Sequence, residues 1–242
     1  DCSSDVCSSD LLSELMSVSH MTVRRDIRVL EEQGKVVSVS GGVRLSEALR
    51  QELAYCEKAQ LHHRHKREIG KYAASLVEDG QVVYLDAGTT TFEIARSLAE
   101  RFNLTVVTND FSIIQHLMNR PQLSLFHTGG QVDQRNYSCV GNSAAMLLRS
   151  LNIDVAFIST SSWVLEHGLS TPHEEKVLVK QALLEVARRR VLVSDSSKYG
   201  KYGMFRVCPL EALSDIICDA ALPPEAQQLL RERGLQLHNV QL

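Results

Sequence analysis

Residues 82–91 read Val82-Val83-Tyr84-Leu85-Asp86-Ala87-Gly88-Thr89-Thr90-Thr91, and this stretch is the clearest indication of the fold because it joins an apolar strand to a helix. The continuous apolar run is typical of a strand buried on both faces of a parallel sheet. The helix is expected to begin near Phe92. A turn of small residues at a helix N-terminus offers free backbone amides, and the threonine hydroxyls add donors. The stretch indicates phosphate binding, although a threonine cluster is also an ordinary helix cap.

The chain on either side of this stretch alternates between helical and strand patterns from Lys66 onward. Ile69, Ala73 and Leu76 form one helical stripe before the stretch. Amphipathic helices separate the later apolar strands, which are expected at 104–108, 123–127, 155–159, 191–194 and 216–218. This alternation predicts an α/β fold with a mostly parallel sheet.

Polar residues and glycines follow the ends of several predicted strands. Ligands of such sheets bind beyond the carboxyl ends of the strands. Besides the loop at 86–91, the segments found there are Thr108-Asn109-Asp110, Thr128-Gly129-Gly130 and Asp195-Ser196-Ser197-Lys198-Tyr199-Gly200. We expect these segments to converge on one ligand.

A second informative stretch runs from Ser19 to Gly34, where the spacing predicts a helix with two chemically different faces. Ser19 suits the N-cap and Gly34 the position just past the helix end. An apolar stripe is made by Val23, Ile27 and Leu30, and a cationic face opposite it by Arg24, Arg25 and Arg28. Three arginines on one face are also typical of a merely solvated helix.

The residues around this helix extend the pattern. Leu12, Leu15 and Met16 suggest the end of a supporting helix, followed by a turn over 17–19. Residues 35–44 read as two short β segments that turn at the pair Gly41-Gly42. A helix, a turn, a second helix and a β-ribbon form the layout of a winged helix-turn-helix.

On these motifs the chain resembles the DeoR family of bacterial transcriptional regulators. The DNA-binding signature is the run Val18-Ser19-His20-Met21-Thr22-Val23-Arg24-Arg25-Asp26-Ile27 with the glycine pair after it. The later motifs are the Asp-x-Gly-Thr-Thr loop, the Thr-Asn turn, the Gly-Gly turn and the Asp-x-Ser-Lys-Tyr-Gly segment, and the match spans most of residues 66–237. The resemblance implies a sugar-phosphate sensor domain related in fold to phosphosugar isomerases and CoA transferases.

The resemblance also implies site residues. The helix at 19–34 would lie in the DNA major groove, with Ser19 and Thr22 on the backbone and arginines near phosphates and base edges. The DNA-binding set is Ser19, Thr22, Arg24, Arg25, Arg28, Gly41 and Gly42. Gly88 to Thr91 would hold a phosphate, and Lys198 would approach the anion. The effector-binding set is Asp86, Gly88, Thr89, Thr90, Thr91, Asn109, Gly129, Gly130, Glu175, Lys180 and Lys198.

Two positions leave alternatives open. Glu174 stands beside Glu175, so either carboxylate could face the pocket. Trp163 lies where the family commonly has a glycine-containing turn, and it could reshape the pocket or simply pack there.

Composition limits the class of protein. The 242 residues carry a net charge of −3, which restricts any DNA contact to a local surface. No apolar run approaches the roughly 20 residues of a membrane span, so we expect a cytoplasmic protein with no membrane partner. The cysteines at 56, 139, 208 and 218 and the histidines at 62, 63 and 65 lack zinc spacing, so no metal or cofactor is predicted.

The first eleven residues do not fit this scheme. Cys-Ser-Ser-Asp occurs twice, and no apolar periodicity is present, so we expect 1–11 to be a non-native leader without a helix. The expected domains are a truncated winged helix-turn-helix over 12–45, a linker helix over 46–65 and an effector-binding domain over 66–242. Without a complete first helix, the N-terminal module should be only partly stable.

Three functions follow from these patterns. The favoured one is a transcriptional regulator, a repressor of a carbohydrate catabolic operon, controlled by a phosphorylated sugar or sugar acid. The alternatives are a phosphosugar isomerase or CoA-transferase-like enzyme, and a ligand-binding oligomer with a non-functional DNA module. Five basic and four acidic residues at 11–45 give one copy a weak electrostatic footprint, so we expect a homo-oligomer on operator DNA.

Overall fold

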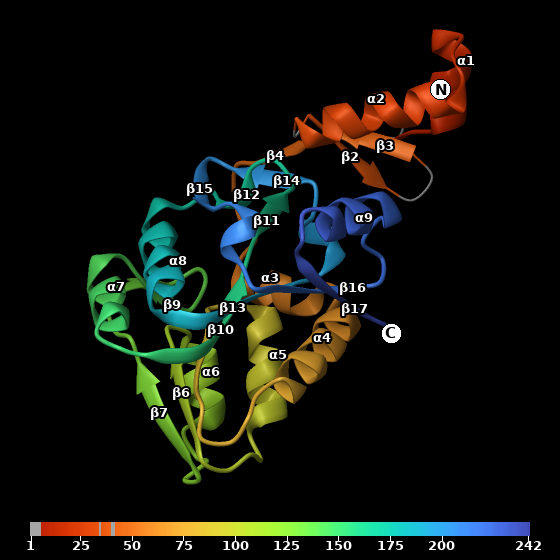
Figure 1. The fold of residues 1–242 in the computed structure, drawn as a ribbon. Coiled ribbons are helices and arrows are strands. Elements are labelled where there is room, and N and C mark those ends of the chain that lie inside the picture. The colour runs from red at the N-terminus through yellow and green to blue at the C-terminus, as the bar shows by residue number, and fades with distance from the viewer. Residues whose placement is uncertain (1–5, 34, 40–41) are drawn as a thin grey trace.

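The computed structural model describes residues 6–33, 35–39 and 42–242. It consists of a small N-terminal module at one end of a larger α/β domain (Figure 1). The module contains β1 (Val6–Cys7), α1 (Ser9–Met16), α2 (His20–Glu32), β2 (Val36–Val39) and β3 (Gly42–Leu45). The three strands form a sheet in the order β1-β3-β2. The predicted pair of β segments is confirmed as β2 and β3, while Gly34, predicted to follow the end of the helix, lies outside the described residues.

Helix α2 begins as the sequence predicts. The Ser19 side chain accepts a hydrogen bond from the Thr22 amide at 3.2 Å, which caps the helix. Val23 is buried at 3% exposure, but Leu30 is 37% exposed and no residue of α1 is buried. The apolar stripe of α2 is therefore only partly covered.

The expectation that residues 1–11 carry no helix is wrong for Ser9 to Leu11. Helix α1 starts at Ser9, and the Ser8 hydroxyl accepts a hydrogen bond from the Leu11 amide at 3.1 Å. Val6 and Cys7 pair with Arg44 and Val43 of β3. A good N-cap and a strand partner give these residues local structure that apolar periodicity does not reveal.

The linker helix predicted over 46–65 is wrong for residues 46–54, whereas 55–60 and 63–65 are helical. The chain there forms β4 (Glu47–Leu49), an extended stretch, α3 (Tyr55–Gln60) and the start of α4 (His63–Ser75). Strand β4 pairs in parallel with β14 (Lys201–Gly203), and the Glu47 amide donates to the Gly200 carbonyl at 3.0 Å. This pairing with a distant segment overrides the local helical preference.

The main sheet has seven parallel strands in the order β17-β16-β13-β10-β5-β6-β7. Their bounds are β5 (Val82–Leu85), β6 (Leu104–Thr108), β7 (Leu123–His127), β10 (Ile153–Ser159), β13 (Ala187–Ser194), β16 (Asp215–Asp219) and β17 (Gln236–Val240). All six predicted strands are confirmed, and β17 extends one edge. The strand order reverses between β5 and β10, which is where a ligand is expected in such a sheet.

Helices cover both faces of this sheet. Helices α4, α5 (Thr89–Leu98) and α6 (Phe111–Leu117) share one core with Val83 and Leu85, whereas Tyr84 faces the other core. That second core contains residues of α7 (Asn142–Arg149), α8 (Glu174–Val186) and α9 (Pro224–Glu232). The alternation along β5 confirms a strand buried on both sides.

Short strands extend the domain beyond the main sheet. β8 (Gln131–Asp133) and β9 (Ser138–Val140) form a hairpin, and a three-stranded sheet contains β11 (Ser162–Val164), β12 (Gly168–Thr171) and β15 (Phe205–Cys208). Strands β4, β11, β12 and β14 lie between the main sheet and the N-terminal module (Figure 1). Trp163 of β11 is fully buried, and its Nε1 donates to Ser194 Oγ at 3.1 Å. This residue packs instead of lining a cavity.

Candidate functional site

Two adjoining cavities lie at the carboxyl ends of β5 and β10. Both are lined by Glu52, Lys58, Ala87, Gly88 and the run 159–161. The first cavity adds Tyr55, Asp86, Asn109, Asn136, Ser138, Val140, Thr171, Lys176, Val179 and Lys180. The second adds Leu49, Leu53, Lys66, Thr89, Thr90, Val193, Ser194, Asp195, Lys198 and Lys201. The cavities therefore meet at the reversal of strand order.

The loop between β5 and α5 has a defined internal structure. Thr91 Oγ1 donates to the carbonyls of Asp86 and Gly88 at 2.5 and 2.8 Å, and Thr91 is fully buried. A Cβ atom at Gly88 would lie 3.0 Å from the Ser159 Cβ, so a small residue suits this close approach. Helix α5 starts at Thr89, three residues earlier than predicted. Thr91 thus shapes the loop, and Thr89 and Thr90 face the cavity.

The first turn of α5 supplies anion-binding chemistry. The amides of Thr89 and Thr90 occupy the first two helical positions, where no partner exists within the helix. The amides of Ala87 and Gly88 are already bound, by Asn109 Oδ1 at 2.9 Å and Asp110 Oδ2 at 3.1 Å. An anion in the second cavity is therefore expected to meet the Thr89 and Thr90 end of the loop.

Asp86 and Lys180 form a buried ion pair beneath the loop. Asp86 Oδ2 accepts hydrogen bonds from the amide and hydroxyl of Ser159, both at 3.0 Å, and from Lys180 Nζ. Lys180 Nζ also donates to the Ser159 carbonyl at 2.6 Å. Asp86 is 2% and Lys180 7% exposed, so the pair is buried. Through Asp86, Ser159 and Lys180 it links the end of β5, the end of β10 and α8.

Asn109 and Asp110 support the same loop from β6. Asn109 accepts from the Tyr84 hydroxyl at 2.8 Å and donates to the Cys139 carbonyl at 2.9 Å. Asp110 caps α6 through the amides of Ser112 and Ile113. Burial raises the Asp110 pKa to about 6. Asn109 lines the first cavity, but both its Oδ1 and its Nδ2 already make hydrogen bonds within the protein.

Lysines dominate the charge of the two cavities. Among the described residues that line them, six lysines stand against three carboxylates. Sequence reasoning found Lys180 and Lys198 and missed Lys58, Lys66, Lys176 and Lys201. The spacing of Lys176 to Lys180 in α8 could have placed both on one helix face. For Lys58 no local signal exists, because it lies in the stretch predicted to be a linker. Lys66 is the first residue of the predicted effector-binding domain, and its local sequence does not mark it as a cavity residue.

Several predicted effector residues lie elsewhere. Glu175 and Glu174 are exposed, and neither lines a cavity. Gly129 and Gly130 have positive φ values of 64° and 114° and form the turn after β7, outside both linings. Asp195 was not in the predicted set, yet it lines the second cavity and its Oδ2 is buried with no hydrogen-bond partner. That oxygen could accept a hydrogen bond from a ligand hydroxyl.

Lys66 should make anion binding depend on pH. Burial lowers its pKa to about 8, so the side chain is an ammonium ion below pH 8 and neutral above it. Sulfate keeps its charge across this range, and its affinity should fall about tenfold between pH 7.5 and 9.5 as the cation is lost. We expect the Lys66→Met variant to bind sulfate weakly with a nearly flat pH profile, measured by thermal shift. A wild-type profile that stays flat would contradict this role.

The predicted DNA-binding residues divide into two groups. The first is accessible: Ser19, Arg24 and Arg25 are exposed and Thr22 is half-buried. The residues of the second group make contacts within the protein. Arg28 pairs with Glu32 at 3.2 Å and with Glu232 of α9. A Cβ at Gly42 would lie 2.2 Å from the Cys7 carbonyl oxygen, so this glycine serves the close approach of β1. Gly41 lies outside the described residues.

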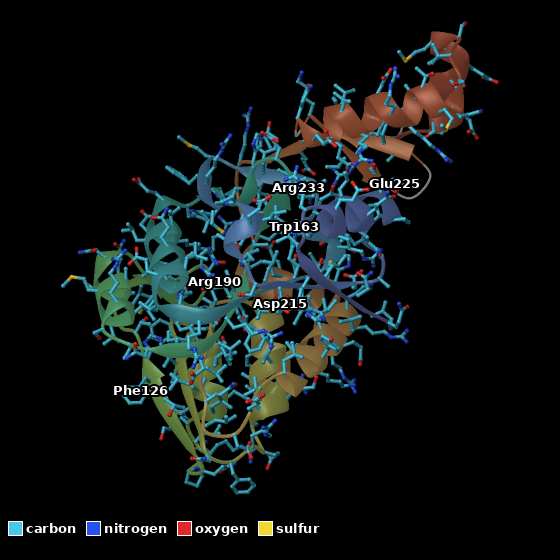
Figure 2. The ribbon with its side chains drawn as sticks, viewed as in Figure 1. Phe126, Trp163, Arg190, Asp215, Glu225 and Arg233 are labelled. Atoms are coloured by element: carbon cyan, nitrogen blue, oxygen red, sulfur yellow. The ribbon has the colours of Figure 1, made fainter. Side chains whose placement is uncertain are left out.

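A third cavity separates the N-terminal module from α9. Arg24, Arg28 and Glu31 line it from the module, and Glu225 and Gln228 line it from α9. Figure 2 shows Glu225 at the side of α9 next to that module. Arg28 therefore contacts the larger domain in this arrangement.

A buried hydrogen-bond cluster joins the two parts of the chain. Glu31 of α2 is 2% exposed and accepts from the Ser38 amide at 3.0 Å, the Ser38 hydroxyl at 2.7 Å and the Tyr199 hydroxyl at 2.6 Å. The Tyr199 ring lies 4.9 Å from that of Trp163. Gly200 has a φ of 84°, and a Cβ there would lie 2.7 Å from Val37 Cγ2. Both Tyr199 and Gly200 thus contact the N-terminal module.

No cluster of three or more His, Cys, Asp or Glu side chains among the described residues could hold a metal ion. None of the helices in the described part of the chain combines the length and apolar character needed to cross a bilayer.

Comparison with known proteins follows this division of the chain. The family described as DeoR-like helix-turn-helix domain matches residues 3–48, and that described as DeoR C terminal sensor domain matches residues 61–220. An uncharacterized HTH-type transcriptional regulator of Haemophilus influenzae is 48% identical, over 96% of this chain and 90% of its own. A putative aga operon transcriptional repressor of Escherichia coli O157:H7 is 31% identical, over 93% of this chain and 85% of its own.

A solved structure is similar to part of the chain. Ribose 5-phosphate isomerase A of Methanocaldococcus jannaschii is 19% identical, with a TM-score of 0.41 over 55% of this chain and 53% of its own.

Proposed function

Because the chain belongs to the DeoR family of transcriptional regulators, we propose that it is a ligand-controlled repressor of a carbohydrate catabolic operon. The ligand is a phosphorylated sugar or sugar acid, bound where the two cavities meet. Its binding changes the affinity of the N-terminal module for operator DNA, which is linkage between two sites. The name of the relative described as an aga operon repressor supports the choice of repression.

The observation that carries this proposal is the position of residues 195–203. Asp195 and Lys198 line the second cavity, whereas Tyr199 donates to Glu31 of α2. The next residues, in β14, pair with β4, which follows the wing strand β3. One short segment thus contacts both the ligand cavity and the DNA-binding module. A ligand that favours one position of Lys198 would bias the contact made by Tyr199.

The phosphate is proposed to bind in the second cavity. The Thr89 and Thr90 end of α5 provides amides and hydroxyls, and Lys66 and Lys198 provide positive charge. Asp195 Oδ2 is the acceptor for a sugar hydroxyl. Asp86 accepts hydrogen bonds on both oxygens, from the Ala87 amide on Oδ1 and from Ser159 and Lys180 on Oδ2. Membership of the DeoR family and the attached N-terminal module favour sensing over isomerase chemistry.

On the DNA side, Ser19 and Thr22 are proposed to contact the backbone, and Arg24 and Arg25 to reach phosphates or base edges. Arg28 would reach DNA only after leaving Glu232. A homo-oligomer on a repeated operator is proposed because one copy has a weak cationic footprint.

A thermal-shift screen with phosphorylated sugars and sugar acids tests the ligand site. A ligand at about 100 times its dissociation constant adds roughly 2.7 kcal/mol of stability. We expect Thr90→Ala to weaken the binding of any hit about 10- to 100-fold, because a hydroxyl bond to a charged group is worth about 1.5–3 kcal/mol. Ser97→Ala, on the same helix but outside both cavities, should leave the shift unchanged. A Thr90→Ala variant that binds like the wild type contradicts the phosphate position.

A further inference from the structure

Glu52 occupies the junction of the two cavities. It comes from the extended stretch between β4 and α3 and lines both cavities. Its Oε1 accepts a hydrogen bond from Lys58 Nζ at 2.8 Å, and its Oε2 accepts one from Lys176 Nζ. The Glu52 side chain is only 11% exposed. A carboxylate of the polypeptide therefore lies inside the candidate ligand site.

Lys58 and Lys176 depend on this carboxylate. Their side chains are 13% and 14% exposed. Lys58 has one other acceptor, Asn136 Oδ1 at 2.6 Å, and Lys176 lies 3.8 Å from Asp133 Oδ2. Without Glu52 the two ammonium groups would share a half-enclosed space with little negative charge. Buried charges are costly unless they are paired, so this position requires an anion.

We propose that Lys58 and Lys176 form a carboxylate subsite of the effector site, and that Glu52 fills this subsite when no effector is bound. The effector then carries two anionic groups, a phosphate at Thr89 and Thr90 and a carboxylate at the lysine pair. This inference rests on the proposed function and specifies its ligand as a phosphorylated sugar acid. The two subsites adjoin, because Glu52, Lys58, Gly88 and Ser159 line both cavities.

Charge explains why such a ligand would be selected. An aldose phosphate brings one anionic group, so displacing Glu52 with it would leave the lysine pair without a partner. A phosphorylated sugar acid replaces the departing carboxylate with its own. The exchange keeps both lysines paired and adds a phosphate to the second cavity, where Lys58, Lys66, Lys198 and Lys201 outnumber Glu52 and Asp195.

Displacement of Glu52 would also act on the DNA-binding module. Glu52 lies three residues after Leu49, the last residue of β4. Strand β4 pairs with β14 and directly follows the wing strand β3. When Glu52 leaves Lys58 and Lys176, the extended stretch after β4 loses its contacts with the cavity. This stretch adjoins both the wing strand β3 and the segment that carries Tyr199.

Calorimetric titration of the full chain with matched ligand pairs tests this proposal. The probes are phosphorylated aldonic acids of three to six carbons and the aldose phosphates of the same chain length. We expect the wild type to bind at least one acid at least tenfold more tightly than its matching aldose phosphate. Glu52→Gln, which removes the competing charge, should raise affinity for that acid at least tenfold and affinity for the aldose phosphate less than threefold.

Two variants serve as controls. Glu174→Gln makes the same charge change at an exposed position outside both cavities and should alter neither affinity. Lys176→Gln should abolish the preference for the acid while the aldose phosphate still binds. Circular dichroism establishes that each variant is folded before titration.

Each outcome is decisive. Equal affinities of wild type for acids and aldose phosphates, or a Glu52→Gln variant that affects both alike, would overturn the carboxylate subsite and leave the proposed function standing. The wild-type comparison holds even if Glu52→Gln fails to fold. If no phosphate ester binds to the wild type or to Glu52→Gln, the proposed function fails together with this inference.

Discussion

Asp86→Asn is expected to destabilise the α/β domain by about 3–5 kcal/mol, because it leaves the buried Lys180 ammonium without its counterion. The substitution keeps the size of the side chain and removes only its charge. The effect should be large since Asp86 is 2% and Lys180 7% exposed, and Ser159 also donates twice to this carboxylate. Denaturant unfolding measures the loss directly.

Two further variants separate charge pairing from shape. Asp86→Asn combined with Lys180→Met removes both charges and should recover at least about 2 kcal/mol of the loss. Glu185→Gln breaks the exposed pair with Arg149, where the side chains are 53% and 40% exposed, and should cost less than about 1 kcal/mol. If Asp86→Asn lowers the free energy of unfolding no more than Glu185→Gln does, the pair of Asp86 and Lys180 does not stabilise the loop.

Tyr199→Phe is expected to uncouple the ligand site from DNA binding. The variant deletes the hydroxyl that donates to Glu31 at 2.6 Å and leaves Lys198 and the cavity lining in place. Allosteric couplings are commonly 5- to 150-fold in affinity, and we expect the effect of ligand on DNA affinity to fall below about threefold in this variant. Ligand affinity measured without DNA should stay within about threefold of wild type.

A backbone variant and a tyrosine control sharpen this test. Gly200→Ala strains a positive φ of 84° and puts a methyl group 2.7 Å from Val37 Cγ2, so it should separate the module and the domain at the same contact. Tyr137→Phe alters an exposed tyrosine of the β8–β9 hairpin and should leave the coupling unchanged. Coupling that survives both Tyr199→Phe and Gly200→Ala would exclude this contact as the route.

The parts of the fold that local patterns specify were predictable. The apolar run at 82–85 and the strands at 104–108 and 123–127 match β5, β6 and β7 residue for residue. Ser19 caps α2 because a hydroxyl at that position satisfies an amide of the first turn, which is a local interaction. The loop at 86–91 was located for the same reason, since a strand, a small-residue turn and a helix are consecutive in the chain.

The rest of the candidate site depends on contacts between distant segments. Glu52 and Lys58 lie in the polar stretch predicted to be a linker helix, and their side chains are enclosed because Glu52 contacts Lys176 of α8 and Lys58 contacts Asn136. Thr91 has the same chemistry as Thr89 and Thr90, so only the loop geometry shows that its hydroxyl turns inward. Arg28 reads as a DNA contact until α9 places Glu232 beside it.

Control of DNA binding by the ligand site through residues 195–203 can be measured by fluorescence anisotropy. The full chain is titrated onto a duplex selected from fragmented genomic DNA, with and without a phosphorylated ligand. This ligand is one that raises the melting temperature of the protein, and it is used at saturating concentration. We expect the ligand to change the dissociation constant for DNA at least fivefold in the wild type and less than threefold in Tyr199→Phe. A wild-type DNA affinity that the bound ligand leaves unchanged would contradict this control.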